Sequence, residues 1–445
     1  MTAGDAAWVL VAAALVLFMT PGLALFYGGM DRSRNVLNMI MMSFWCLLTV
    51  PIVWVAAGFS LAYSGKGRFI GDFDWAFLNK MDINTKLGDG MAISGGGRLL
   101  LAVIFLGMFA VITPALISGA VADRMKFAAW AVFVPLWVLL VYAPVSYWIY
   151  GGYWVDGAVS GWLGSRGSLD FAGGTVIHVN AGIASLAGVL VLGKRRGWPK
   201  EGHPPHNMTL VMLGAGILWF GWFGFNAGSA FAANGTAIQA FMNSFLAAAA
   251  AGLAWAIVER VKDGHFTNLG VASGIVAGLV AITPAAGFVS GMAPIFIGAI
   301  AGVACCFAVN LKFKARYDDS LDVVGVHFVG GLVGSLLIGL FSNPEFFGTV
   351  GTVKPGLFYG GGTDLLLEQL LANVVTIIYS FTVTTLIFLE LKHTIGIRVS
   401  DEAEDVGLDL DQHSETAYHE SSQLMSRVSD LAGSLSGTSE RVGSS

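Results

Sequence analysis

The sequence predicts an all-α membrane protein that crosses the bilayer many times. Of its 445 residues, 55% are hydrophobic and only 12% are charged, and the mean hydropathy is +0.71. A soluble domain carries about 25% charged residues, so this chain has too little polar surface to cover a soluble core of its size. Its 59 glycines agree with this class, because small residues let helices pack closely in lipid. Three cysteines, two of them adjacent, indicate no disulfide framework.

Long apolar segments follow one another along the chain, and an α-helix needs roughly 20 such residues to cross the hydrocarbon core. Proline and glycine interrupt several of the segments, which neighbouring helices in a bundle tolerate. We therefore expect eleven transmembrane helices, at residues 7–29, 38–62, 98–121, 127–150, 171–193, 208–231, 236–258, 268–286, 290–311, 323–342 and 363–390.

The positive residues predict how these helices are oriented. Alternate loops, at residues 30–37, 122–126, 194–207, 259–267 and 312–322, hold 13 Lys and Arg, whereas the opposite set holds 7. Cytoplasmic loops are the positive ones in membrane proteins. We therefore expect the N-terminus outside and the C-terminus in the cytoplasm, as an odd number of spans requires.

The end of the chain has a different composition. Residues 400–445 hold ten Asp and Glu and only two Arg, and serine is frequent near the end. We therefore expect a transmembrane domain over residues 1–391 and a cytoplasmic tail over residues 392–445. The last twenty residues, Ser-rich and weakly amphipathic, are expected to be disordered or conditionally helical.

Two of the eight histidines, His178 and His327, lie well inside apolar segments. An acidic residue precedes each at the start of its segment, Asp170 and Asp322, and a glycine follows each four residues later. By the predicted orientation, the fifth segment enters from outside and the tenth from inside. This pattern predicts an inverted repeat of spans 1–5 and 6–10, whose substrate site lies near the midplane.

An ionisable residue inside the membrane is costly, so it is a functional candidate by default. For a single buried histidine, a structural role, as a neutral ring hydrogen-bonded between helices, is as good an explanation as a functional one. Two histidines at matched positions favour a functional role. Burial favours the neutral rings, which can hydrogen-bond to a small polar solute or relay a proton. Zinc wants three or four ligands, and no third strong ligand lies deep in a neighbouring segment, so we expect no metal.

Aromatic residues mark two other segments. The third carries Phe105 and Phe109, and the sixth carries WFGWFGFNAGS at 219–229. Each ring alone is most simply explained by packing, but glycines alternate with the rings and Ser229 ends the motif. Such a helix can line a narrow route that its rings block, with a hydroxyl that binds a solute. Asp170 is expected to cap the fifth span, and a carboxylate at the outer rim would also favour cations.

Several stretches resemble the ammonium transporter (Amt/Mep/Rh) family, in its bacterial Amt branch, from residue 6 to about residue 420. DFAGGTVIHVNAG and WFGWFGFNAGS are the most specific, together with the GVH motif. The resemblance implies a homotrimer in the cell membrane, with one pore in each protomer. The matching stretches are ALVLFMTPGLALFYGGM (14–30), ITPALISGAVADRMKF (112–127), DFAGGTVIHVNAG (170–182), PHNMTLVMLGAGILWFGWFGFNAGSA (205–230), DVVGVHFVGGLVGSL (322–336) and VGLDLDQHSETAY (406–418).

By motif position, the resemblance implies roles for the residues that line the pore. His178 and His327 resemble the twin pore histidines. Phe109 and Phe225 resemble the stacked rings that close the outer end of the pore. Phe105 resembles the neighbour of the gate in the vestibule.

The resemblance also implies a recruitment site outside the gate. Ser229 resembles the serine that binds the cation, and Asp170 resembles an aspartate nearby that acts more through structure and field than through contact. The family usually presents a tryptophan just before a Gly-Gly, where this chain has Tyr150 in PVSYWIYGGYW. Tyrosine still offers a π face to a cation, although tryptophan is better. Trp148 lies two positions earlier, roughly on the opposite side of a helix.

The function implied is ammonium transport, with methylammonium as a further substrate to test. Because charge at the bilayer centre is costly, the cation should lose its proton near the gate and pass the histidines as ammonia. The proton either follows through the histidines and water or returns outside. No cofactor and no nucleic-acid partner are expected.

Two other functions compete with this one. The stretch VGLDLDQHSETAY resembles the family's cytoplasmic tail, which in many bacterial members meets a PII-type signalling protein that plugs the pores. The protein could therefore serve mainly as an ammonium sensor, with a regulatory tail. An enzyme ranks third, because no nucleophile is visibly paired with either histidine and no HExxH motif occurs.

Overall fold

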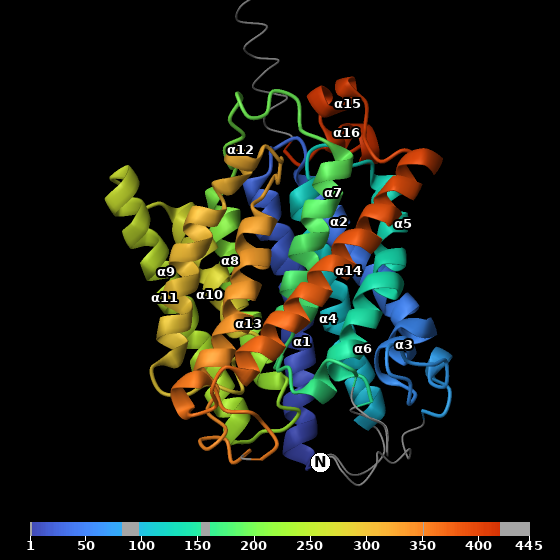
Figure 1. The fold of residues 1–445 in the computed structure, drawn as a ribbon. Coiled ribbons are helices and arrows are strands. Elements are labelled where there is room, and N and C mark those ends of the chain that lie inside the picture. Colours follow the sequence, from blue (N-terminus) through green and yellow to red (C-terminus); the bar gives the residue numbers. More distant parts are fainter. Residues whose placement is uncertain (1, 82–97, 153–160, 350, 419–445) are drawn as a thin grey trace, which may run out of the picture.

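The computed structural model describes residues 2–81, 98–152, 161–349 and 351–418, and in these ranges the protein is helical (Figure 1). The expectation for the last twenty residues lies outside the described part. The helices are α1 (Ala3–Met30), α2 (Val36–Val53), η1 (Trp54–Gly58), α3 (Phe59–Tyr63), η2 (Ala76–Leu78), α4 (Arg98–Val121), α5 (Phe127–Trp137), η3 (Val138–Tyr142), α6 (Ala143–Tyr150), η4 (Gly164–Arg166), η5 (Gly174–Val179), α7 (Asn180–Leu192), α8 (Met208–Gly228), α9 (Gly235–Asp263), α10 (Asn268–Ile282), α11 (Ala293–Ala308), α12 (Leu311–Ala315), η6 (Val324–Phe328), α13 (Val329–Phe341), η7 (Leu357–Tyr359), α14 (Asp364–Thr394), α15 (Asp401–Val406) and α16 (Leu408–His413).

Within the described ranges, ten helices are long and apolar enough to cross a membrane. They coincide with ten of the eleven predicted spans. The remaining prediction, residues 268–286, forms the shorter apolar helix α10, which has 15 residues. The all-helical, many-span class is therefore confirmed, and the count of eleven stays a prediction.

Helices α1 and α8 run antiparallel along the middle of the molecule. The indole of Trp8 donates to the carbonyl of Ala227 at one end (3.2 Å), and the backbone N–H of Asn207 donates to the carbonyl of Gly29 at the other (3.1 Å). A Cβ added at Gly214 would lie 2.4 Å from a backbone nitrogen of α1, so only glycine permits this approach. This close contact brings side chains of both helices to the same central cavity.

Four of the described membrane helices contain a π-helical turn: η1, η3, η5 and η6. Pro51 and Pro135 each lie three residues before one of the first two, and proline removes a helical hydrogen bond. No proline precedes η5 or η6, which contain His178 and His327. Turns of this type occur often at functional sites.

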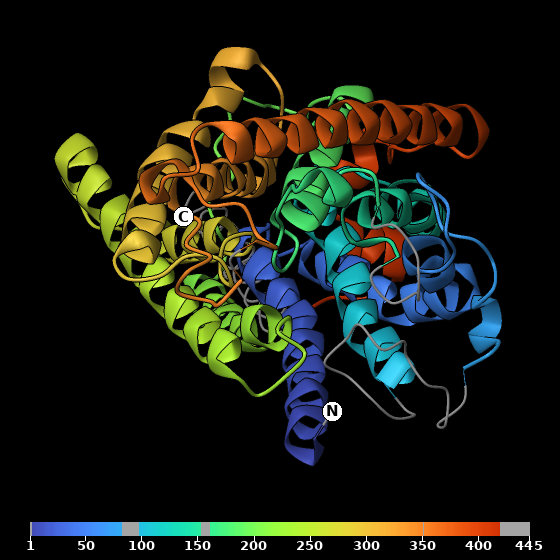
Figure 2. The same cartoon turned by 60° about the horizontal axis from the view of Figure 1, so that its bottom comes forward.

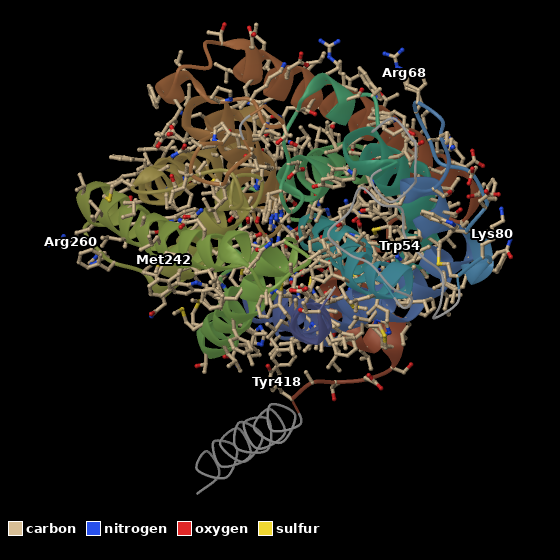
Figure 3. The ribbon with its side chains drawn as sticks, turned by 90° about the horizontal axis from the view of Figure 1, so that it is seen from below. Trp54, Arg68, Lys80, Met242, Arg260 and Tyr418 are labelled. Atoms are coloured by element: carbon tan, nitrogen blue, oxygen red, sulfur yellow. The ribbon has the colours of Figure 1, made fainter. Side chains whose placement is uncertain are left out.

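The outer surface of the bundle is apolar, and charge gathers at its edges. Helix α14 crosses the outside of the bundle obliquely (Figure 2), where the Trp137 indole donates to the Thr384 hydroxyl (2.9 Å). In the view from below, Figure 3 shows Arg68, Lys80 and Arg260 at the outline of the molecule. Large apolar side chains are exposed on the outer helices, among them Ile52, Leu253 and Ile378, as in a body surrounded by lipid.

The described part of the tail folds back onto the bundle, at the end where α2 begins (Figure 1). Asp409 accepts hydrogen bonds from the backbone N–H groups of Leu37 and Asn38 (3.1 and 2.8 Å), so a tail carboxylate caps α2. The N–H of Leu408 donates to the side-chain oxygen of Asn35 (2.8 Å). The tail is therefore docked up to residue 418.

Candidate functional site

The two predicted histidines meet inside the bundle. The Nδ1 atoms of His178 and His327 lie 3.3 Å apart, with ring centroids 5.3 Å apart and planes inclined by 15°. One Nδ1 therefore donates to the other, which leaves each ring its Nε2. Both residues are buried, and the Nε2 of His178 has no hydrogen-bond partner.

Glycines placed four residues after the histidines make this meeting possible. A Cβ added at Gly182 would lie 2.4 Å from the backbone nitrogen of Phe328, beside the second histidine. A Cβ added at Gly331 would lie 3.0 Å from the Cβ of His178. Each histidine segment thus also supplies a glycine, and each glycine packs against the π-turn of the other segment.

Asp170 begins the turn that carries the first histidine. One carboxylate oxygen accepts from the N–H groups of Gly173 and Gly174 (2.9 and 2.7 Å), and the other from those of Thr175 and Val176 (2.8 and 3.0 Å). The residue is 6% exposed. Because four backbone donors saturate both oxygens, Asp170 acts on a nearby cation through its field.

At the second histidine, the acid that caps the π-turn as Asp170 does at the first is Asp319 and not Asp322, the acidic residue at the start of that span which the sequence pattern paired with Asp170. Asp319 lies eight positions before His327, the same spacing that separates Asp170 from the first histidine. Its Oδ2 accepts the N–H of Val324 at the start of η6 (2.7 Å). The physical reason is that the first N–H groups of each turn need an acceptor at one fixed position.

Asp322 has a different partner. Its Oδ1 lies 2.6 Å from the Nζ of Lys312, which also donates to the backbone carbonyl of Asp319 (3.0 Å). The second oxygen of Asp319 is buried without a hydrogen-bond partner. Burial raises the pKa of Asp319 from 3.8 to about 6, against the lowering effect of Lys312.

The histidines border a very small cavity of about 10 Å³. The rest of its lining is apolar and comes from α1, α4, α8 and α10. This volume is near the minimum that one water molecule needs. The pair therefore borders an apolar space with room for about one water molecule.

Phe109 and Phe225 separate this cavity from a much larger one. Their ring centroids are 4.3 Å apart; Phe225 faces the small cavity and Phe109 the large one. Phe105 is fully buried and packs against Phe109 (4.9 Å) and Phe231 (5.1 Å). Phe105 thus packs between Phe109 and Phe231 and is not among the residues that line the large cavity; its part in recruitment stays a prediction.

The large cavity has a volume of about 670 Å³, and Tyr150, Asp170 and Ser229 are among its lining residues. We call this end the vestibule mouth. The hydroxyl of Ser229 donates to the Phe225 carbonyl (2.8 Å), so its lone pairs stay available to N–H donors. The described residues that line it include no Lys or Arg.

Tyr150 and Trp148 point to different places, as their helical spacing predicted. Tyr150 lines the vestibule, and its hydroxyl oxygen is buried without a hydrogen-bond partner. The indole of Trp148 donates to the carbonyl of Phe69 (2.7 Å), and its ring packs against Tyr379 (4.6 Å). Trp148 therefore does not replace the missing vestibule tryptophan.

A third cavity of about 210 Å³ lies at the opposite end of the same helices. Met30 lines it, one turn beyond Phe26 of the histidine cavity on α1, as do Lys312 and Asp322. We call this end, formed by Lys312, Asp319, Asp322 and the 210 Å³ cavity, the lysine mouth. The three cavities thus follow one another along these helices: the 670 Å³ cavity, then the histidine cavity behind the phenylalanines, then the 210 Å³ cavity at the lysine mouth.

Sequence reasoning missed Trp222 as a site residue. Its ring stacks on His178 at 5.4 Å, and its indole donates to the hydroxyl of Thr283 (2.8 Å). A signal was present, because Trp222 precedes Phe225 by three positions and so shares its helix face. For Asp319, the missed signal was the repeated spacing of eight residues.

The site offers hydrogen bonding and proton exchange. Among the described residues, no group of three His, Cys, Asp or Glu is placed to hold a metal ion. The two imidazoles are the polar groups of an otherwise apolar passage. Such an arrangement can pass a small, neutral, hydrogen-bonding solute in single file.

Comparisons with a family profile and with known sequences all point to the same family. A profile described as the Ammonium Transporter Family matches residues 7–418. The "Ammonium transporter" of Mycobacterium tuberculosis (strain H37Rv) is 48% identical over 99% of this chain and 96% of its own length. The "Ammonium transporter" of Aquifex aeolicus is 49% identical, over 94% of this chain and 93% of its own.

Solved structures agree with this result. Candida albicans Mep2 superposes with a TM-score of 0.83 at 33% identity, over 94% of this chain and 91% of its own. Saccharomyces cerevisiae Mep2 gives a TM-score of 0.81 at 34% identity, over 90% and 88%. A structure described as a sensor Amt protein gives 0.83 at 27% identity, over 92% and 98%.

Proposed function

Because the chain belongs to the Ammonium Transporter Family, we propose that it conducts ammonium or ammonia through the passage between its two mouths. It does so as a multi-pass protein of the bacterial cell membrane, with the N-terminus outside and the tail in the cytoplasm. In this orientation the vestibule mouth faces outside. The excess of Lys and Arg in the opposite set of loops supports it.

The vestibule mouth recruits the ammonium ion. Ser229 accepts an N–H from the ion, because its own hydrogen is engaged with the Phe225 carbonyl. Tyr150 offers its ring face to the cation, and the Asp170 carboxylate adds a favourable field. An ion without N–H donors, such as K⁺, gains less from the serine and still loses its hydration.

The cation gives up a proton before it passes the phenylalanines. A charge is costly in a passage with room for about one water, whereas ammonia is neutral and small. The ammonia then exchanges hydrogen bonds with the twin histidines. The pair also provides a route by which the proton can follow.

The observation that carries this proposal is the histidine pair, with its 3.3 Å contact, directly behind the stacked Phe109 and Phe225. His178→Ala should abolish transport or its selectivity for ammonium in proteoliposomes. His265→Ala, in an exposed loop, is the matched control. Selective, wild-type flux through His178→Ala would remove the histidine from the mechanism.

The movement of charge can be measured separately. Solid-supported membranes record current when ammonium is pulsed onto the same proteoliposomes. A current that scales with flux supports a proton that travels with ammonia. Flux without current shows that the proton returns outside.

We further propose an inverted repeat and a trimer. The equal spacing of Asp170 to His178 and of Asp319 to His327 supports the repeat, as does the reciprocal packing of the two glycines. Family resemblance supports the homotrimer. Native mass spectrometry of the detergent-solubilised protein tests it, and a monomeric mass would contradict it.

A second candidate function, ammonium sensing, rests on the tail. Asp409 caps α2, and the N–H of Arg196 donates to Glu404 (2.8 Å), so the tail contacts two loops at the lysine mouth end. A PII-type protein is the expected partner at this face. Truncation after residue 394 tests the candidate: retained flux with lost regulation indicates a transporter with a regulatory tail. If wild-type protein signals in cells without measurable flux, sensing is primary.

A further inference from the structure

The lysine mouth contains a buried ammonium group that belongs to the protein itself. Lys312 is 8% exposed, and its Nζ donates to the backbone carbonyl of Asp319 and to the Asp322 carboxylate (3.0 and 2.6 Å). Lysine is almost never fully buried unless it is paired. These two oxygens therefore form a site that holds a primary ammonium group.

This site lies where the passage opens. The cavity that Lys312 lines is also lined by Met30 and Leu269, on the two helices that carry Phe26 and Val276 to the histidine cavity. Asp322 lies five residues before His327 on the chain that forms η6. In the proposed mechanism, a solute that leaves the histidines towards this end therefore enters the cavity that Lys312 lines.

The chemistry of the bound group is that of the transported ion. The ε-ammonium of lysine differs from ammonium by one carbon substituent, and it satisfies the same acceptors with the same N–H bonds. At the vestibule mouth, by contrast, Ser229 keeps its lone pairs free, and the described lining residues include no Lys or Arg. The vestibule mouth is therefore open to an ammonium ion, whereas the acceptors at the lysine mouth already bind the ammonium group of Lys312.

We propose that Lys312 occupies a built-in ammonium site at the lysine mouth and thereby keeps free ammonium from binding there. The inference rests on the proposed transport function. Its consequence is an asymmetric pore, which recruits the cation at the vestibule mouth and resists inhibition by ammonium that accumulates at the other. Like charges repel, so a second cation cannot share the two acceptors.

The test uses right-side-out membrane vesicles from cells that express the full chain. Initial uptake of external ¹⁵N-ammonium is measured against increasing luminal ¹⁴N-ammonium. In Lys312→Met, which keeps a long apolar stem but lacks the charge, luminal ammonium should halve uptake at a concentration about tenfold lower than in wild type, because the vacated acceptors favour a cation. Lys314→Met, an exposed lysine on the same short helix, is the matched control and should resemble wild type.

A second variant separates the site from a general structural effect. Lys312→Met combined with Asp322→Asn removes both charges, so resistance to luminal ammonium should return. A Lys312→Met protein that transports with wild-type resistance overturns the inference, as does an equal shift in Lys314→Met. Where Lys312→Met does not fold, Lys312→Gln is measured, and wild-type resistance in that variant overturns the inference equally.

A different result would contradict the proposed transport function. In that case, wild-type vesicles would show no saturable ammonium uptake above vesicles without the protein. The inference about Lys312 fails only when wild-type uptake is present and the lysine variants leave its luminal inhibition unchanged.

Discussion

The two mouths share one structural feature, an aspartate that caps a π-turn, but the side chains around that aspartate differ. In each, an aspartate eight residues before a histidine caps a π-turn. At the vestibule mouth, four backbone donors saturate Asp170, and a 670 Å³ cavity remains open to a cation. At the lysine mouth, Asp319 keeps one oxygen without a partner, and Lys312 brings a positive charge to the site.

The comparison shows that the capping aspartate holds the π-turn that carries the histidine, whereas the side chains around the aspartate set the charge and the open volume of each mouth. Both caps place a histidine at the same central contact. In the proposed mechanism, the serine and tyrosine at one end favour a cation, and the lysine at the other end disfavours one. Two similar capping turns are thus compatible with an asymmetric function.

The strongest way to break the comparison is to weaken each cap in turn. Asp170→Asn keeps one acceptor oxygen and leaves two buried N–H groups unpaired, at a cost of roughly 1–3 kcal/mol each. Asp319→Asn should cost less, because its amide oxygen can still accept from Val324. Unfolding of the detergent-solubilised proteins measures both, with Ser168→Ala as a buried control near Asp170. Equal losses from the two Asn variants would show that the caps do not differ.

The second test is the pH dependence of stability. The folded state raises the pKa of Asp319 from 3.8 to about 6, so it binds this proton more tightly than the unfolded state. The contribution of Asp319 to stability is therefore fully present below pH 4 and is lost as the pH rises to about 6, by up to about 3 kcal/mol. The difference in unfolding free energy between wild type and Asp319→Asn should change across this window. A constant difference from pH 4 to pH 7 would contradict the raised pKa.

A third test concerns the histidine cavity between the mouths. Trp222→Phe shrinks the ring that stacks on His178, a contact worth about 0.5–1.5 kcal/mol, so ammonium flux should fall by about two- to tenfold. Thr283→Val keeps the stacked ring but removes the hydroxyl that accepts from the indole and donates to the Leu279 carbonyl (2.7 Å), and it should have a smaller effect. Flux is measured in proteoliposomes at matched protein content. If Thr283→Val has the larger effect, the hydrogen bond rather than the stacking matters.

The smallest effect is expected at Tyr150. Tyr150→Phe removes a hydroxyl oxygen that is buried without a hydrogen-bond partner and keeps the ring face, so the half-saturating ammonium concentration should change by less than about twofold. Tyr150→Trp should lower that concentration, because indole binds cations better. Tyr147→Phe is the control, since that hydroxyl donates to the Gly67 carbonyl instead (2.6 Å). A larger change in Tyr150→Phe would instead give the hydroxyl a part in recruitment.

The sequence by itself determined the all-helical, many-span class and the positions of its spans. Apolar length and turn residues are local properties, so they can be read without knowing which helices touch. The two intramembrane histidines were recognisable for the same reason, since a titratable ring in an apolar run is unusual wherever it packs. Motif likeness pointed to the phenylalanines and Ser229, whose roles as gate and recruitment site stay predictions.

Only the tertiary structure decided which acid matches Asp170 and what surrounds the histidines. Asp319 and Asp322 are three residues apart, and only the hydrogen bonds show that the first caps η6 while the second holds Lys312. Motif likeness implied a vestibule position for Phe105, and only packing shows that it is buried against Phe109. Partner choice across distant helices depends on how closely glycines let the backbones approach. For that reason, the pattern of one segment alone cannot specify it.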